Sequence, residues 1–220
     1  MSKQFAVIGI GRVGASLVST LDALGHDVLG VDREEDRIQD LSDELPGVHL
    51  VTANAAKAEV LRNLGLEQFD GAAVVIGESI QDSVLVTLIL KDLGVPMVFS
   101  RANNDLHARV LGRIGADHVI QPEKEFGEFL ARQMSLPGIQ DYLELGNDEA
   151  IIEIEVPGEW VDKSLADLSL HRKKGLTVLA IKGKDKGGTL PQPDTPLEEG
   201  TVLVLGGPKK ELDNFDPNSV

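Results

Sequence analysis

Short apolar runs alternate with amphipathic stretches along the first 135 residues of the chain. Each run is rich in β-branched residues and is closed by Gly, Asp, Asn or Ser, which is typical of strands. The apolar runs predict strands at Gln4–Ile8, Asp27–Val31, Val48–Thr52, Ala72–Ile76, Met97–Ser100 and His118–Ile120. Helical periodicity predicts helices at Arg12–Leu24, Glu34–Glu44, Ala58–Leu64, Ile80–Leu93, Leu106–Ile114 and Glu123–Met134.

The strict alternation of strands and helices favours a parallel sheet with helices on its faces. The run Ala72–Ile76 is apolar throughout, so its strand is expected to be buried on both sides. The predicted fold class is therefore α/β, with a doubly wound parallel sheet of the Rossmann type.

The alternation of strands and helices ends at Pro137 and Gly138, in a stretch without helical periodicity. The break predicts two domains, a Rossmann domain over residues 1–135 and a small α+β domain over residues 136–220. In the second domain we expect strands at Ile151–Val156, Thr177–Lys182 and Thr201–Leu205, a short helix near Leu165–Leu168 and a terminal helix from Pro208 to about Asn214. The segments Lys184–Gly188 and Leu190–Pro196 are typical of a hairpin and a loop.

The composition favours a cytoplasmic protein. A chain of 220 residues that is 42% hydrophobic can bury the cores of one large and one small domain. Cysteine is absent and no leader-like segment opens the sequence, so we expect a reducing compartment without disulfides or thiolate chemistry. The longest apolar run, Val84–Leu90, is far too short to span a bilayer, so no direct membrane insertion is expected.

The charge of the chain argues against nucleic-acid binding. It carries 36 acidic and 21 basic residues, which gives a formal charge of -15. A field of this sign repels phosphate backbones and anionic lipid headgroups. Nucleic acid is therefore excluded as an expected partner.

Gly9, Gly11 and Gly14 form a G-x-G-x-x-G pattern directly after the first predicted strand and at the start of the first predicted helix. In this context Gly9 permits the tight turn, Gly11 lets a pyrophosphate approach the backbone, and Gly14 allows the helix to pack closely on the strand. The helix N-terminus adds amide donors and a partial positive charge that favour phosphate. The alternative is a glycine-rich turn in a fold that has lost its ligand.

Asp32 ends the second predicted strand, where an acid can accept both hydroxyls of an adenosine ribose and would repel a 2′-phosphate, so NADP is disfavoured. Its alternative role is an N-cap ahead of the helix Glu34–Glu44. Arg12 lies inside the glycine loop, where a cation suits terminal phosphates better than a nicotinamide. This position favours ATP or ADP over NAD, and a solvated arginine is the alternative.

No pattern of catalytic residues accompanies the glycine loop. The sequence has no G-x-S-x-G and no H-E-x-x-H, and its five histidines are scattered. The C-terminal part adds the basic run His171–Lys174 but no acid/base constellation of the kind that a dehydrogenase needs. We assign no catalytic residue and expect no enzyme, while an NAD-dependent oxidoreductase and a Rossmann subunit of another ion system stay as alternatives.

Several motifs along nearly the whole chain can be compared with known families: Ala6–Gly14, Gly30–Asp32, Ala53–Ala55, Ile76–Ser83 and Ile114–Glu125. The most specific feature is Gly115-Ala116-Asp117 followed by a strand and by Pro-Glu-Lys, which is not a feature of dehydrogenases. In these motifs the chain resembles the RCK proteins that regulate potassium conductance, and among them the cytoplasmic subunits of Ktr-type and Trk-type potassium transporters.

The resemblance implies a regulatory protein that changes conformation when a nucleotide binds and catalyses no reaction. Subunits of this family assemble as dimers and then as an octameric ring beneath a membrane dimer, and the nucleotide in each Rossmann site reshapes the ring. By resemblance, the chain is a regulatory subunit that senses ATP/ADP or NAD(H). It would lie in the cytoplasm, peripheral to the inner membrane through a potassium-transporting membrane partner.

The resemblance also assigns a nucleotide site position by position. The phosphate loop carries over to Gly9, Gly11, Arg12, Val13 and Gly14, and the ribose acid to Asp32, with Arg33 following where the family varies. The remaining positions would line the adenine side (Asn54, Ala55), the sheet edge (Ile76, Gly77, Glu78) and a phosphate or ribose contact (Arg101).

Two further assignments rest on the resemblance alone. Glu123 matches a glutamate that in the Ktr branch helps to hold Mg²⁺, Ca²⁺ or Na⁺ at the nucleotide phosphates between protomers, and the alternative is a helix-start acid after Pro122. Through Ser164–Leu168 and Gly175–Ile181 the C-terminal part resembles the RCK-C domain, which binds cyclic di-AMP between protomers in several members. Where those members have an arginine before a small residue, this sequence reads His171-Arg172. A plain dimerisation module is therefore the alternative.

Overall fold

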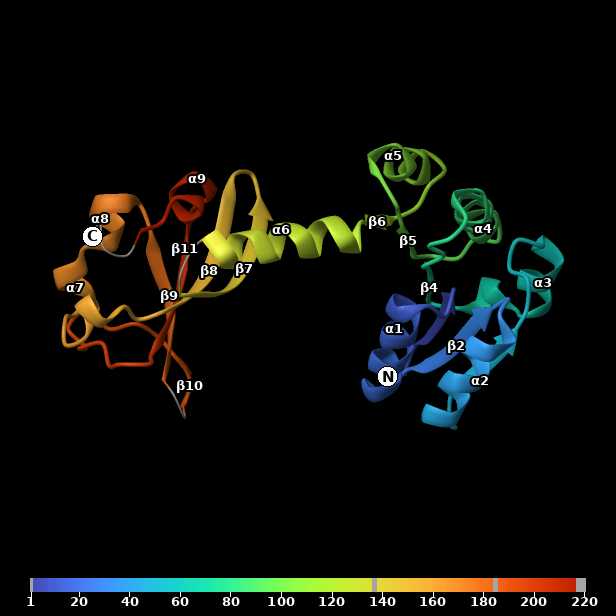
Figure 1. The fold of residues 1–220 in the computed structure, drawn as a ribbon, viewed down its shortest axis with the longest axis horizontal. Helices are drawn as coiled ribbons and strands as arrows, with labels where there is room; N and C mark the ends of the chain where they lie inside the picture. The colour runs from blue at the N-terminus through green and yellow to red at the C-terminus, as the bar shows by residue number, and fades with distance from the viewer. Residues whose placement is uncertain (1, 136–137, 184–185, 217–220) are drawn as a thin grey trace. The chain divides into compact units, whose positions relative to one another are not determined.

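The chain divides into two compact units, Met1–Pro122 and Glu123–Val220 (Figure 1). The computed structural model describes residues 2–135, 138–183 and 186–216. Helix α6 (Pro122–Ser135) begins where the first unit ends. The domain limit that the sequence predicts at residue 135 lies at the other end of this helix and stays a prediction.

Six parallel strands form the sheet of the first unit, in the order β3-β2-β1-β4-β5-β6. All neighbouring pairs are parallel, so the predicted doubly wound sheet is confirmed. The strands are β1 (Gln4–Ile8), β2 (Asp27–Asp32), β3 (His49–Thr52), β4 (Gly71–Val74), β5 (Val98–Arg101) and β6 (His118–Ile120). The helices are α1 (Arg12–Ala23), α2 (Glu35–Glu44), α3 (Ala58–Asn63), the 3-10 helix η1 (Leu66–Gln68), α4 (Ile80–Asp92) and α5 (Asp105–Arg113).

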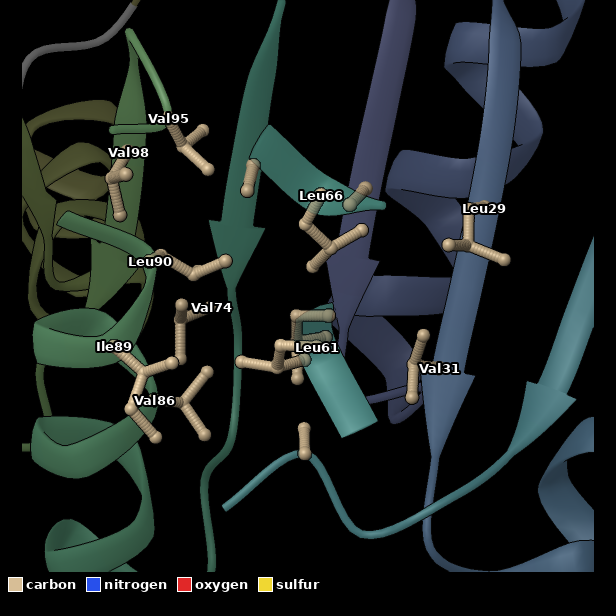
Figure 2. Close-up of a cluster of buried hydrophobic side chains, with 14 residues drawn as sticks. Leu29, Val31, Leu61, Leu66, Val74, Val86, Ile89, Leu90, Val95 and Val98 are labelled. Atoms are coloured by element: carbon tan, nitrogen blue, oxygen red, sulfur yellow. The ribbon is translucent and has the colours of Figure 1, made fainter. Parts of the chain in front are cut away.

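The helices cover both faces of this sheet because successive strand residues point to opposite sides. Ile8 of β1 belongs to a buried cluster with residues of α3 and α4, whereas Val7 belongs to the cluster beneath α1 and α2. Figure 2 shows the first of these clusters, in which Leu61 of α3 and Leu90 of α4 are fully buried. Burial on both sides makes the sheet a rigid base for the loops at its edge.

The second unit is a small α+β module, as the sequence predicts. Its five strands form an antiparallel sheet in the order β10-β9-β11-β8-β7, with a core around Trp160. The elements after α6 are β7 (Ile139–Gly146), β8 (Glu149–Glu155), η2 (Gly158–Trp160), α7 (Leu165–Leu168), α8 (Leu170–Lys174), β9 (Thr177–Gly183), β10 (Lys186–Thr189), β11 (Val202–Pro208) and α9 (Lys209–Asp213). Across the described residues of both units, no helix combines the length and the apolar character needed to cross a membrane.

Strand β7 is the main element that the sequence pattern did not predict. It occupies the stretch directly after Gly138 and pairs with β8 through a tight turn. Asn147 and Asp148 both have positive φ, 52° and 60°, as the central residues of a type I′ hairpin turn do. Apart from Ile139, the residues of β7 are exposed or half-buried, because it lies at the sheet edge. The hydrophobic alternation of a strand is therefore missing, and the Asn-Asp pair is the signal that was available.

Smaller differences concern short elements and element ends. Strand β4 ends at Val74 rather than Ile76, and α8 had not been predicted. The terminal helix begins at Lys209 because Pro208 still pairs with Glu149 in the sheet. Of the predicted hairpin, residues 184–185 lie outside the described residues, and β10 pairs with β9 beyond them.

A buried histidine in α5 gives the first unit a sensitivity to acid. His107 is 2% exposed, and its Nδ1 accepts a hydrogen bond from the backbone N–H of Asn103 at 3.2 Å. Among the described residues its Nε2 has no hydrogen-bond partner. Burial lowers the pKa of this imidazole below its ordinary 6.5, because the protonated ring would lack solvation and would lose the Asn103 bond.

We expect the free energy of unfolding to fall as the pH drops below about 6.5, because the unfolded chain then binds a proton that the folded chain still rejects. The contribution of His107 to the free energy of unfolding is fully present at pH values above its ordinary pKa. It is lost as the pH falls from there toward the lowered pKa of the folded state. Urea unfolding at pH 7.5 and 5.5 measures it. The pH-dependent loss should be smaller in His107→Gln and unchanged in His49→Gln, whose residue is exposed. Equal losses in all three proteins would contradict this account.

Candidate functional site

A pocket opens at the carboxyl ends of the parallel strands of the first unit. It lies beside β1, where the strand order turns from β2 on one side to β4 on the other. Such a switch point is where doubly wound sheets bind their ligands. The volume of the pocket, including the part that is open to solvent, is about 730 Å³. Of the residues predicted for the site, those that line it are Gly9, Gly11, Asp32, Arg33, Asn54, Ala55, Ile76, Gly77, Glu78 and Arg101.

The glycine loop is shaped by its own backbone contacts. Gly9 has φ +102°, and a Cβ atom on Gly14 would lie 1.9 Å from the Gly9 carbonyl oxygen. These two glycines are therefore required for α1 to approach β1. A Cβ on Gly11 would meet no atom within 4 Å, so contacts within the chain do not require glycine there. The open space over Gly11 suits the close approach of a ligand.

The start of α1 is available to an anion. Gly11 is the N-cap and supplies no side-chain hydrogen bond to the first turn. The first amides of a helix otherwise need an acceptor from outside, and a phosphate can provide it. Arg12 is exposed in this turn and does not line the pocket, Val13 packs into the cluster beneath α1, and Gly14 is buried.

Asp32 is 6% exposed and holds two loops together. Its Oδ2 accepts the backbone N–H of Ile10 at 2.6 Å, and its Oδ1 accepts the N–H of Glu34 at 2.9 Å. The N-cap position of α2 belongs to Glu34, so Asp32 is not the N-cap residue itself, although its side chain accepts the backbone N–H of the residue at that position. The carboxylate instead fixes the glycine loop relative to the end of β2, with its oxygens at the wall of the pocket.

Two arginines and Glu78 form an ionic bridge at the pocket. Glu78 follows β4, and its carboxylate pairs with Arg33 at 3.0 Å and with Arg37 at 2.5 Å. The hydrogen bond from Arg37 is the main reason that the pKa of Glu78 lies below its ordinary value. Sequence reasoning missed Arg37, which also lines the pocket; its spacing of one helical turn from Arg33 was the available signal.

Gly77 and Arg101 bring the end of β5 to the same pocket. A Cβ on Gly77 would lie 2.5 Å from Nη1 of Arg101, so the glycine makes room for the guanidinium. Asn103 Nδ2 donates to the Gly77 carbonyl at 2.8 Å and ties the loop after β4 to the loop after β5. Arg101 thus lies in the pocket wall beside Gly77.

The other predicted contacts lie in the second unit. Glu123 is the second residue of α6, and its predicted role at a cation stays a prediction. No group of three or more histidine, aspartate or glutamate side chains among the described residues is placed to hold a metal ion. His171 and Arg172 line an open cavity between α7, α8 and β9, together with Pro191 and Pro193. Binding of cyclic di-AMP there also stays a prediction.

Known protein families match both halves of the chain. The TrkA-N domain matches residues 5–122 and the TrkA-C domain matches residues 150–218. Ktr system potassium uptake protein A of Bacillus subtilis is 38% identical over 215 residues, covering 98% of this chain and 96% of that protein. The protein of the same name from Vibrio alginolyticus is 36% identical over 212 residues, covering 96% of each.

Solved structures agree with the fold. The GsuK RCK domain superposes with a TM-score of 0.67 at 21% identity, over 96% of this chain and 46% of that one. The GsuK channel bound to NAD gives 0.69 at 20% identity, over 96% and 38%. At this identity the likeness concerns the fold alone. Because the TrkA-N domain spans more than half of the chain and the Ktr proteins match nearly all of it, the chain belongs to the TrkA-N/TrkA-C family of Ktr potassium uptake proteins.

Proposed function

We propose that this chain is the nucleotide-sensing regulatory subunit of a potassium uptake system and acts on a separate potassium-transporting membrane protein. The observation that carries the proposal is the pocket at the switch point, where a glycine loop and a buried acid meet. The family membership supports potassium uptake as the process that is regulated, since the relatives bear that name.

The ligand is an adenosine nucleotide, ATP/ADP or NAD(H). Asp32 offers a carboxylate to the ribose hydroxyls, and the uncapped start of α1 offers amides to phosphate. Arg12 in that first turn favours a chain of terminal phosphates, and hence ATP or ADP. A cation of the Mg²⁺, Ca²⁺ or Na⁺ kind would join the phosphates through Glu123 of a neighbouring protomer, since such ions prefer carboxylate and phosphate oxygens.

Binding without turnover fits the walls of the pocket. Its described lining residues include no histidine, lysine or tyrosine that could serve as an acid or base for hydride transfer. The carboxylates of Asp32 and Glu78 already accept hydrogen bonds from within the chain. These features support regulation over the NAD-dependent oxidoreductase alternative.

Exposed apolar side chains support assembly into a homo-oligomer. On α6, Phe126, Leu130 and Met134 are spaced four residues apart and are exposed among the described residues, so they form an apolar stripe along one face of the helix. Leu88 of α4 and Leu106 of α5 are exposed as well. A dimer that extends to an octameric ring would bury such faces.

A ring can convert ligand identity into a change of shape. ATP and ADP must then bind two ring conformations with different relative affinity, and couplings between sites are typically about 1–3 kcal/mol. Over the eight sites of an octamer, even about 1 kcal/mol each exceeds the roughly 5.5 kcal/mol that moves a population from mostly closed to mostly open.

Removing the ribose acid should weaken every adenosine ligand. We expect Asp32→Ala to lose about 1–3 kcal/mol of binding for ATP, ADP and NADH alike, because all three present the same ribose diol and need the same glycine loop. Calorimetry on folded protein measures this loss. Asp36→Ala, an exposed acid on α2, serves as the control and should bind as the wild type does. Unchanged affinity in Asp32→Ala would remove this residue from the site.

Removing the positive charge of Arg12 should weaken the binding of ATP more than the binding of AMP. We expect Arg12→Ala to cost ATP about 1.5–3 kcal/mol more than it costs AMP, because only ATP carries the terminal phosphates that a charge-assisted bond would reach. Titration of both ligands into wild type and variant gives the difference. Arg113→Ala changes an exposed arginine of α5 and should leave both affinities as they are. Equal losses for ATP and AMP would limit Arg12 to the first phosphate.

The whole proposal is tested by assembly and flux. We expect light scattering to find an oligomer, and potassium uptake by liposomes that hold the membrane subunit to differ between added ATP and added ADP. Asp32→Ala should abolish that difference while the oligomer persists. A strict monomer with either nucleotide, or equal flux with both, would overturn the regulatory reading and favour the oxidoreductase.

A further inference from the structure

The ionic bridge at the pocket joins two segments that are far apart in the sequence. Arg33 and Arg37 follow β2, whereas Glu78 follows β4, and these two strands flank β1 on either side. Each carboxylate oxygen of Glu78 accepts a hydrogen bond from one arginine: Arg33 donates to Oε2 and Arg37 donates to Oε1. The bridge thus spans the pocket from the ribose side to the far side.

The same bridge touches the acid proposed to bind the ribose. Nη1 of Arg37 lies 3.5 Å from Oδ2 of Asp32, and the other amino group of its guanidinium is held by Glu78. Arginines that follow the second strand of a Rossmann sheet are the residues that accommodate a ribose 2′-phosphate in NADP sites. This chain has two arginines in that place, yet both are directed to a carboxylate of its own.

The charges around the bridge balance one another. Arg33 also pairs with Glu34 at 3.1 Å and lies 3.7 Å from Asp82. The charged side chains that line the pocket are three acids and three arginines: Asp32, Glu78, Asp82, Arg33, Arg37 and Arg101. Because both arginines of the bridge are paired with carboxylates, neither is left to offset the repulsion between Asp32 and a 2′-phosphate, whereas a free hydroxyl is neutral.

We infer that Glu78 is a second determinant of ligand choice, beside Asp32: it occupies the guanidinium groups of Arg33 and Arg37, so that neither is free to pair with a 2′-phosphate and the pocket accepts a free ribose hydroxyl. The inference rests on the proposed binding of adenosine nucleotides and names the subclass that the site takes. Glu78 acts here as a positioning residue through the two arginines. Because these side chains are partly exposed, their pairs contribute little to folding stability, and removing one should leave the fold intact.

AMP and adenosine 2′,5′-bisphosphate provide the test, since they differ only in the 2′-phosphate. Calorimetry should show that the wild-type chain binds AMP at least about tenfold more tightly. In Glu78→Gln this preference should shrink about tenfold, because one negative charge is gone and both arginines are released toward the phosphate. Adding Arg37→Gln to that variant should restore much of the preference.

Glu34→Gln is the matched control. It makes the same change of charge and also removes a partner of Arg33, but Glu34 belongs to the same segment as the arginines and does not line the pocket. Its preference should stay much closer to that of the wild type than the preference of Glu78→Gln does, because Glu78 still pairs with both arginines. An unchanged preference in Glu78→Gln, with thermal unfolding like that of the wild type, would overturn the inference while leaving nucleotide binding in place. A wild-type chain that binds neither ligand would overturn the proposed function as well.

Discussion

The close approach of α1 to the end of β1 is the constraint on which the pocket depends. It requires glycine at position 14, where any Cβ would overlap the Gly9 carbonyl, and a positive φ at position 9. The approach turns the first amides of α1 toward the space beyond the sheet and leaves Gly11 uncovered. The proposed anion site would therefore be formed by the backbone itself, before any side chain contributes.

Asp32 extends this constraint from one loop to two. Its carboxylate accepts N–H groups of Ile10 and Glu34, so the glycine loop and the end of β2 hold each other in place. The same buried oxygens are those that a ribose would meet. In the proposed function, Asp32 would both fix the loops and bind the ligand, which would give the nucleotide a preformed site and link its occupancy to the shape of the loops.

The two compact units differ in the type and the burial of their sheets, one parallel and one antiparallel. The parallel sheet is buried on both faces and has the pocket at the carboxyl ends of its strands. The second unit has a single core around Trp160 and an edge strand, β7, that is largely solvent-exposed. In the family reading, the first unit would sense the nucleotide, and the exposed apolar faces would carry that state to neighbouring subunits.

The sequence by itself determined the doubly wound sheet, the glycine loop and Asp32, because period-two and period-3.6 patterns and short motifs are local properties of the chain. It also predicted residues at the ends of β3, β4 and β5 for the nucleotide site, but only through a family resemblance, and the structure places these residues in the wall of the pocket. Tertiary structure alone decided what depends on distant segments. The bridge from Glu78 to Arg37 joins residues 41 positions apart, Asp32 reaches back 22 positions to Ile10, and β7 is a strand because β8 pairs with it rather than because its own pattern is apolar. Long-range pairing of charges and of backbone groups leaves no periodic signal in the sequence, so only the folded chain reveals it.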